Sequence, residues 1–450
     1  STLFPYTTLF RSPYRMSLET PLQLRPRLIR PLPSPLGLYI HVGRIDQGEL
    51  LNLMSQGHAQ YFGFVFQATL LKRDRELRER ALANRFDAIL DPRTQAAAMV
   101  GGHSSEIARL PWGAAVPHTI QDFEGARGRR VAAVLADCVM SHGFTQVIAP
   151  THLLHSSGDD WLPLDLEVAR ALREELDTRG GHDVQILYSL AIPYAVFRDP
   201  AERRVLIRDL RRLPIDALWL HIDGLGSGAT SNGVRNYIEA ATDFAMLNLP
   251  VVADGMGGLA GLAVLAFGGA GGLAHGLTFG ERVDHSSWRH ARPTGGFGPT
   301  RRVYVPELDL MLDPTTASDF MHGSRRAHAL FACRDSECCS RGLRDMLEEP
   351  ARHFLVQRMK QVAMLGRIHL PLRAEYFLEE QLRPTTEWVV QATNLRVRDE
   401  RLKEKLTAQR KRLDGLRTSL WQLSREGLRR SSPEILPKTR AARELRISPR

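Results

Sequence analysis

Residues 217–224 read Ala217-Leu218-Trp219-Leu220-His221-Ile222-Asp223-Gly224, an almost wholly apolar run that ends in turn residues. A short apolar run closed in this way is typical of a strand buried on both faces, as the strands of parallel sheets are. Seven further runs of this kind recur along the chain, with amphipathic helical stretches between them. The eight predicted strands are residues 38–42, 61–66, 86–90, 146–149, 184–190, 217–222, 250–253 and 271–274.

Eight strands that alternate with helices match the TIM (β/α)8 barrel, whose usual size of about 250 residues fits the span from Leu38 to His275. We therefore predict an α/β fold with a TIM barrel over residues 38–319. A doubly wound open sheet is the alternative, because it shows the same alternation of strand and helix. The predicted helices cover residues 70–84, 122–142, 164–179, 200–212 and 232–247.

Three of the four cysteines of the chain lie within a stretch of seven residues. They are Cys333, Cys338 and Cys339. Structural zinc is held by four ligands, and three cysteines with one histidine are a common set. We predict that residues 320–383 form a helical subdomain that binds a structural zinc ion, with His353 or His369 as the fourth ligand. Free or buried thiols are the alternative, since adjacent cysteines bind one ion only where the backbone turns sharply.

Both ends of the chain are predicted to differ from the barrel. Residues 1–37 form an irregular lead-in with five prolines between residues 21 and 35, and residues 1–12 look like a translated sequencing adapter. Residues 384–428 form a basic helical arm in which leucines repeat every seven residues, a short coiled-coil pattern. The short repeat favours an arm that packs on the rest of the chain, and a homodimer is the other option. The tail, residues 429–450, is polar and basic and is predicted to be disordered.

The overall composition favours a globular protein without a membrane span. Hydrophobic residues make up 43% and charged residues 24% of the sequence, and no apolar run reaches the ~18 residues that a membrane span needs. Four unevenly spaced cysteines do not make a disulfide framework, so the expected location is the cytoplasm. The net charge of +10 favours a polyanionic partner such as nucleic acid.

Polar residues stand where the predicted strands end. The active sites of TIM barrels lie at the carboxyl ends of the strands, so this set predicts a polar ligand there. The residues are His41, Gln67, Asp91, Thr151, His152, Tyr188, His221, Asp223, Asp254 and His275. Glycine-rich stretches accompany the last three strands, where glycine allows the backbone either to approach a ligand such as phosphate or to pack closely on a helix.

Several of these features resemble the tRNA-guanine transglycosylase family, including its relatives that act on DNA. The segment Ile89-Leu90-Asp91-Pro92-Arg93-Thr94-Gln95 is similar to the family's Leu-Thr-Asp-Ser-Gly-Gly-Phe-Gln pattern, without the two glycines. The segment Val252-Ala253-Asp254-Gly255-Met256-Gly257 looks like the family's seventh-strand loop. His353 and His369 stand sixteen residues apart, as a helix histidine and the zinc-binding histidine do in the family, which makes His369 the preferred ligand. The family's fold is a TIM barrel with a zinc subdomain.

The resemblance implies base exchange at a glycosidic bond through paired aspartates. Such a reaction has an oxocarbenium-like transition state, which needs one carboxylate at C1′ and a second group that handles protons. Asp91 is implied as the proton-handling group and Asp284 as the first candidate for the nucleophile. Asp254 is the second candidate because it stands at the end of a predicted strand. The residues implied to bind the substrate are Gln95, Tyr188, Asp223, Gly224, Gly226, Met256 and Gly257.

The implied function is therefore a transferase that inserts a free guanine or 7-deazaguanine base into tRNA or DNA, as in queuosine-like modification. Two departures keep alternatives open: the cysteine spacing is Cys-x4-Cys-Cys, and no Gly-x-Asp-x-Phe-Asp pattern follows the last strand. One alternative is a catalytically altered barrel that serves as a nucleic-acid-binding subunit of a modification system. Another is a metal-dependent TIM-barrel hydrolase. Its metal ligands would come from His41, His152, His221, Asp223 and His275.

Overall fold

The computed structural model describes residues 36–44, 46–55, 62–277, 281–282, 285, 288–290 and 301–426. Nearly all of the predicted lead-in, the whole of the predicted tail and the predicted nucleophile Asp284 lie outside these residues.

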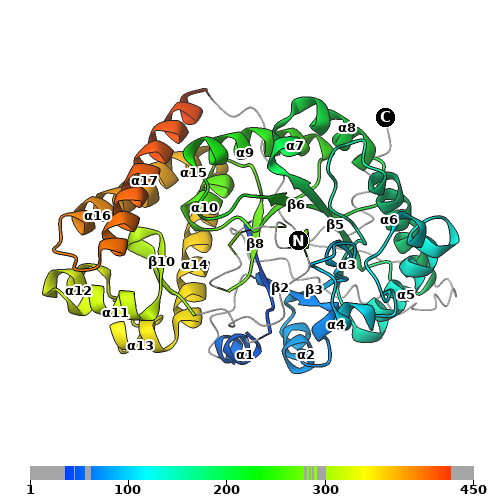
Figure 1. Cartoon of the computed structure of the whole chain (residues 1–450), viewed down its shortest axis with the longest axis horizontal. Helices are drawn as coiled ribbons and strands as arrows, with labels where there is room; N and C mark the ends of the chain where they lie inside the picture. Colours follow the sequence, from blue (N-terminus) through cyan, green and yellow to red (C-terminus); the bar gives the residue numbers. More distant parts are fainter. Residues whose placement is uncertain are drawn as a thin grey trace, which may run out of the picture.

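Eight parallel strands close into a barrel (Figure 1). The first strand pairs with both the second and the eighth, so the sheet has no free edge. This closure confirms the predicted TIM barrel and rules out the doubly wound open sheet. The strands are β1 (Gly37–His41), β2 (Phe62–Gln67), β3 (Asp87–Asp91), β4 (Gln146–Ile148), β5 (Gln185–Pro193), β6 (Ala217–Asp223), β7 (Val251–Asp254) and β8 (Gly272–His275).

Helices cover the outside of the barrel. Their local signals are clear: the Asp199 side chain accepts a hydrogen bond from the Ala201 amide at the start of α8, and α5 ends at Gly143, whose φ is 69°. The helices are α1 (Gln47–Ser55), α2 (Arg75–Ala83), α3 (Thr94–Ala97), α4 (Ser105–Ala108), α5 (Ala126–His142), α6 (Trp161–Thr178), α7 (Tyr194–Arg198), α8 (Pro200–Leu210), α9 (Ser231–Asp243) and α10 (Gly258–Ala266).

The barrel interior is filled by side chains that alternate along the strands with those facing the helices. The interior cluster takes at least one residue from each strand, and the largest is Trp219, which lies 5.3 Å from Tyr39 between ring centroids. The full set is Tyr39, Val65, Ile89, Ile148, Leu187, Ala217, Trp219, Val252 and Ala274. This layer closes the barrel and forms the floor beneath the polar strand ends.

After β8 the chain forms a short antiparallel pair and then helices, which lie together on one side of the barrel (left in Figure 1). The helix α14 packs against β9, α10 and α1, so it joins this region to the barrel. The elements are β9 (Val303–Val305), β10 (Leu310–Leu312), α11 (Pro314–His322), α12 (Arg325–Phe331), α13 (Leu343–Glu348), α14 (Pro350–Gly366), α15 (Leu370–Tyr376), α16 (Arg383–Thr393) and α17 (Glu400–Glu426).

The leucine repeat of α17 is buried within the chain itself. The helix packs along α9 and α16. Gln409, which interrupts the leucine face, donates to the backbone carbonyls of Leu308 and Asp309 at 2.8 and 3.0 Å. A polar residue in the apolar face is therefore satisfied by the turn beneath it. The buried leucines are Leu402, Leu406, Leu413, Leu416, Leu420 and Leu423.

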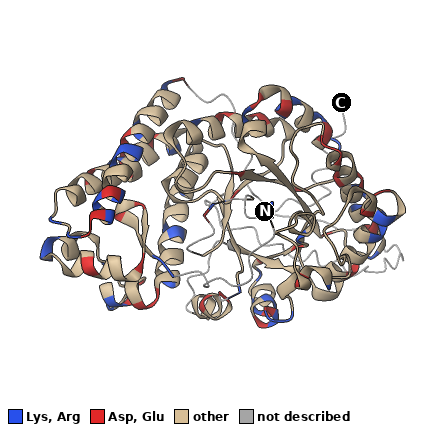
Figure 2. Cartoon of the chain, in the orientation of Figure 1, with Lys and Arg blue, Asp and Glu red and all other residues tan. Residues whose placement is uncertain are grey.

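Charged residues of both signs lie on the outer helices, whereas the barrel strands carry few of them (Figure 2). Many of these charges form pairs one helical turn apart, as Arg75 does with Glu79. None of the helices in the described ranges combines the length and the apolar character that a membrane span requires.

Candidate functional site

The carboxyl ends of the strands surround a cavity of about 630 Å³. Six of the polar strand-end residues line it. They are His41, Gln67, Asp91, Thr151, His221 and Asp254. The carboxylates of Asp91 and Asp254, two of the three predicted catalytic residues, therefore face one cavity.

Asp254, at the end of β7, holds two histidines. Its Oδ1 lies 2.8 Å from Nε2 of His41, at the end of β1, and its Oδ2 lies 2.8 Å from Nδ1 of His221, in β6. Nε2 of His221 is in turn 2.9 Å from Nε2 of His285. Barrel closure thus assembles a continuous chain of ionisable side chains from three strands and the loop after β8.

The negative charge of Asp254 and the positive charge of a protonated His41 stabilise each other. Burial alone would raise the pKa of Asp254, but the imidazoles of His41 and His221 lower it well below its ordinary value of 3.8. Burial would lower the pKa of His41, but Asp254, by charge and hydrogen bond, raises it above 6.5, and Asp91 adds to this effect. Asp254 is therefore an anion at neutral pH, and it favours a protonated His41.

Asp91 ends β3 and is held by a tight turn. Its Oδ1 accepts the backbone N–H of Arg93 at 2.8 Å, and Trp112 donates its indole N–H to the Pro92 carbonyl at 2.9 Å. Arg93 has a φ of 63°, in the left-handed region that favours glycine. Its guanidinium lies 5.6 Å from the ring centroid of Trp288. The turn fixes the Asp91 carboxylate and places an arginine and an indole beside it.

Gln95, a predicted substrate-binding residue, also lines the cavity. Its Nε2 donates to the hydroxyls of Thr151 and Ser189, both at 3.0 Å. These two bonds use both amide hydrogens and hold the side chain in place. The carboxamide oxygen is the remaining group with which Gln95 can accept a hydrogen bond from a ligand.

Tyr188 and Met256, which were predicted to bind the substrate, do not line the cavity. Both are 1% exposed and belong to the core between the barrel and its helices. The reason for Tyr188 is strand alternation: Leu187 faces the barrel interior, so Tyr188 faces outward. The cavity-lining residue of β5 is Ser189.

Gly255 and Gly276 of the glycine-rich loops line the cavity, whereas Gly226 and Gly257 serve packing. A Cβ at Gly257 would lie 2.4 Å from Glu281, and one at Gly226 would lie 2.6 Å from the Glu281 carbonyl. The amides of Gly258 and Leu259 at the start of α10, a type of position that can bind phosphate, donate to the carboxylates of Glu281 and Asp309 at 3.1 and 3.0 Å. The protein's own acids therefore occupy this helix N-terminus.

Asp223 and Gly224 shape the loop that follows β6. Oδ1 of Asp223 accepts the backbone N–H of His285 at 2.7 Å, so this predicted substrate-binding residue positions a cavity histidine. Gly224 has a φ of 90°, a conformation that other residues rarely adopt. Neither residue lines the cavity. Asp223 thus acts on the mouth through His285.

A buried ion pair joins the segment after β8 to α14. Arg358 is 0% exposed and donates to Oε1 of Glu281 at 2.9 Å. We expect Arg358→Met to lower the free energy of unfolding by about 3–5 kcal/mol, because it leaves the Glu281 carboxylate buried without its partner charge. Urea unfolding of the two proteins measures this difference.

Arg344→Met is the matched control, because Arg344 pairs with Glu348 on the surface of α13 and both side chains are about half exposed or more. Loss of this surface ion pair is expected to lower the free energy of unfolding by less than about 1 kcal/mol. Equal effects of the two substitutions would contradict the role assigned to the buried pair.

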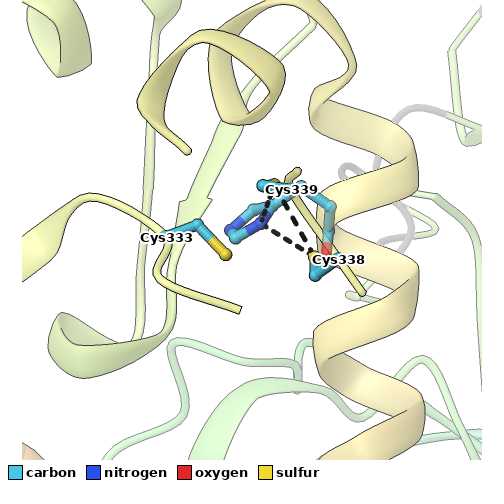
Figure 3. A group of neighbouring side chains, drawn as sticks. Cys333, Cys338 and Cys339 are labelled. Carbon is cyan, nitrogen blue, oxygen red and sulfur yellow. Dashed lines mark hydrogen bonds between the residues drawn. The ribbon is translucent and has the colours of Figure 1, made fainter. Parts of the chain in front are cut away.

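The three clustered cysteines meet one histidine and form a group that could hold a metal ion (Figure 3). The ligand atoms of Cys333, Cys338, Cys339 and His353 all lie within 4.8 Å of one another. The Sγ atoms of Cys338 and Cys339 are 3.7 Å apart, and each is 3.3 Å from Nδ1 of His353. The backbone makes the required turn, since the Asp335 carbonyl accepts the N–H groups of both Cys338 and Cys339.

His353 has the tautomer that a metal ligand needs. Its Nε2 donates to the carbonyl of Tyr304 at 3.0 Å, which leaves the Nδ1 lone pair directed at the thiols. Contacts with Cys333 and Cys339 lower the pKa of Cys338, whereas contacts with Cys333 and Cys338 raise that of Cys339. Three neighbouring thiols cannot all ionise without a cation, so this arrangement fits a bound metal ion.

This geometry corrects the prediction that His369 is the preferred fourth ligand. His369 is exposed at the start of α15 and is not part of the group, whereas His353, the alternative, completes it. The sixteen-residue step therefore gave the wrong histidine. The reason is that α14 places its first turns, and not the turn beyond its end, against the cysteine loop.

Other residues of the mouth were not identified from the sequence as site residues. His285 was missed, although it directly follows the predicted nucleophile Asp284. Arg44, Arg93 and Trp288 were missed as well, and all line the cavity. The only signal for them was their place in loops that follow predicted strands.

Two of the strand-end histidines face away from the cavity. Nδ1 of His152 lies 2.6 Å from Asp165 of α6, and its ring stacks on Trp161 at 3.6 Å. His275 is 0% exposed and packs near Phe354. Within the described ranges, one set of at least three His, Cys, Asp or Glu side chains is close enough to share a metal ion. That set is the group of Cys333, Cys338, Cys339 and His353.

No family model and no curated protein sequence matches the chain. Solved structures match it in fold. The Penicillium canescens endo-1,4-beta-xylanase XylE is 11% identical with a TM-score of 0.33, over 53% of this chain and 81% of that chain. The YdjI aldolase of Escherichia coli K12 is 10% identical with a TM-score of 0.29, over 54% and 74%. The GH26 beta-mannanase BoMan26A of Bacteroides ovatus is 11% identical with a TM-score of 0.35, over 59% and 86%. No activity of this chain follows from these values.

Proposed function

We propose that the barrel mouth exchanges a purine base at a glycosidic bond of a nucleic acid, as the resemblance to the tRNA-guanine transglycosylase family implies. The observation that carries this proposal is that Asp91 and Asp254 line one cavity. Base exchange needs a carboxylate beside C1′ and a group that moves protons to and from the base. Both kinds of group are present in the mouth.

The cavity suits a flipped nucleoside in size and lining. Its volume of about 630 Å³ is within the range of small-molecule sites. Four arginines line it and would meet phosphates of a polyanionic substrate. They are Arg44, Arg93, Arg282 and Arg301. Trp288 offers an aromatic face for a base, and the Gln95 oxygen offers an acceptor for its edge.

The metal group supports the same proposal. We propose that it holds structural zinc, because two thiolates on a tetrahedral zinc ion are expected about 3.8 Å apart from Zn–S bonds of about 2.3 Å. The 3.7 Å separation of the Cys338 and Cys339 sulfurs agrees with this value. The zinc ion would tie the cysteine loop to α14 and take no part in the chemistry.

Asp91→Asn is expected to reduce base exchange at least 10²-fold, because one of the two carboxylates loses its charge. The measurement is incorporation of labelled guanine or 7-deazaguanine into tRNA and duplex DNA by purified protein. Asp137→Asn, on the exposed face of α5, is the control and should retain full activity.

Absence of incorporation by the wild-type protein with every nucleic acid would refute the transferase proposal. If that protein still bound tRNA or DNA with an affinity that falls as salt rises, the nucleic-acid-binding subunit would be the better description.

A further inference from the structure

The hydrogen bonds of Asp254 limit what this carboxylate can do. Each of its oxygens is engaged by an imidazole at 2.8 Å, and its side chain is only 6% exposed. An attack on C1′ would require it to release His41 or His221 and to lose the charge pairing that keeps it ionised. Asp254 is therefore better suited to orient the histidines than to react itself.

The same hydrogen bonds determine which ring nitrogen of His41 carries a hydrogen. A carboxylate only accepts hydrogen bonds, so Nε2 of His41 must carry a hydrogen. Nδ1 of His41 makes no hydrogen bond to any described residue. The side chain is 25% exposed and lines the cavity. His41 therefore presents to the cavity an Nδ1 atom that either accepts a proton or, in the imidazolium form, donates one.

We propose that His41 is the group that transfers protons to and from the base, that Asp254 is its positioning residue, and that Asp91 is the carboxylate that acts at C1′. This assignment rests on the proposed function and changes its roles, since the resemblance gives the proton to Asp91. The arrangement of a carboxylate behind an imidazole is the one that fixes the tautomer in hydrolytic triads.

The reaction balances with these groups alone. In the first half, the C1′–N bond breaks, its electron pair goes to the base nitrogen, and the His41 imidazolium gives that base its Nδ1 proton while an Asp91 oxygen bonds to C1′. In the second half, neutral His41 takes the ring N–H proton of the incoming base as that nitrogen bonds to C1′. The C1′–O bond breaks in the same step, and its electron pair returns to Asp91.

The charged groups around His41 come from several strands. Asp254 of β7 and Asp91 of β3 favour the imidazolium, whereas Arg93 opposes it. His275 of β8 is a further titratable neighbour, and burial lowers its pKa, so it is neutral. The edge of the His41 ring packs against Trp219 of β6, with centroids 6.1 Å apart. Burial also lowers the pKa of His41, but the two carboxylates outweigh burial and the arginine together, so this pKa lies above its ordinary value of 6.5 and the imidazolium is favoured.

A change of leaving group tests the proton role. His41→Gln is expected to slow single-turnover release of guanine about 10²–10⁴-fold. It should slow release of 7-methylguanine less than about tenfold, because that base leaves as a neutral molecule without a proton from the enzyme. Asp91→Asn should slow both. His182→Gln is the control, because His182 also pairs with an aspartate, Asp177, but on the surface. Equal slowing of both bases by His41→Gln would overturn the proposal.

Histidine NMR keeps the inference testable even if the wild-type protein exchanges no base. The ¹⁵N shifts of His41 should report hydrogen on Nε2 and a titrating Nδ1 in the wild-type protein. A hydrogen held on Nδ1 with Nε2 unprotonated, or a His41 that titrates below 6.5, would overturn the assignment. Absence of exchange with these shifts as expected would refute the proposed function while leaving the proton-transfer site in place.

Discussion

Cys338→Ser is expected to abolish stoichiometric metal binding and to lower the free energy of unfolding by on the order of 5 kcal/mol. Isolated zinc-finger peptides gain roughly 10–16 kcal/mol from the ion, but here the helices also pack on the barrel, so the loss is smaller. Cys338 is fully buried between the cysteine loop and α14. Without the ion, the remaining thiols and His353 have no cation to offset their crowding.

The measurement is metal content of the purified protein by elemental analysis, together with urea unfolding with and without a chelator. Cys138→Ser is the control, since Cys138 lies on α5, and burial raises the pKa of its thiol to about 11. His353→Gln and His369→Gln then identify the fourth ligand: only the first should lose the ion. Equal metal content in Cys338→Ser and the wild-type protein would remove the site.

The barrel itself could be predicted from sequence because its signal is local. Each strand is a short apolar run closed by a polar or turn residue, and all eight runs lie within a few residues of the observed strands. The same logic located the mouth, since His41, Asp91 and Asp254 stand at strand ends and line the cavity. Strand ends that converge need no long-range information beyond the fold.

The predictions for Tyr188 and His369 failed because each depended on three-dimensional geometry that a short stretch of sequence does not show. Tyr188 and Ser189 are adjacent, and only the register of the closed barrel decides that Ser189 faces the cavity. His353 and His369 both follow the cysteines, and only the packing of α14 selects His353.

The pairing of Asp254 with His41 joins residues 213 positions apart. Such a contact follows from barrel closure, and neither residue carries a local sign of the other. His41 and His221 were visible in the sequence, where they suggested metal ligands. The structure instead shows both oxygens of one carboxylate engaged by imidazoles. The chemistry of the site thus depends on which partner each group finds, and that partner is set by topology.

Asp254→Asn is expected to reduce base exchange about 10³–10⁴-fold, because an orienting carboxylate replaced by an amide leaves a histidine in the wrong tautomer. An asparagine accepts through one atom and donates through the other, so it can no longer accept from both His41 and His221. The pKa of His41 should also fall, since Asp254 is the first group that raises it. Activity that remains near the wild-type level would contradict the positioning role.

The stability of this variant should depend on pH in a defined window. The pKa of Asp254 is lowered in the folded protein, so its contribution is present above its ordinary value of 3.8 and is lost as the pH falls further. The pKa of His41 is raised, so its contribution is complete below 6.5 and is lost as the pH rises through the folded value. The wild-type protein should therefore exceed Asp254→Asn most clearly between about pH 4 and 6.5. Urea unfolding across this range measures the difference, with Asp137→Asn on the exposed face of α5 as the control. A difference that does not change with pH would show that Asp254 does not favour the charged form of His41.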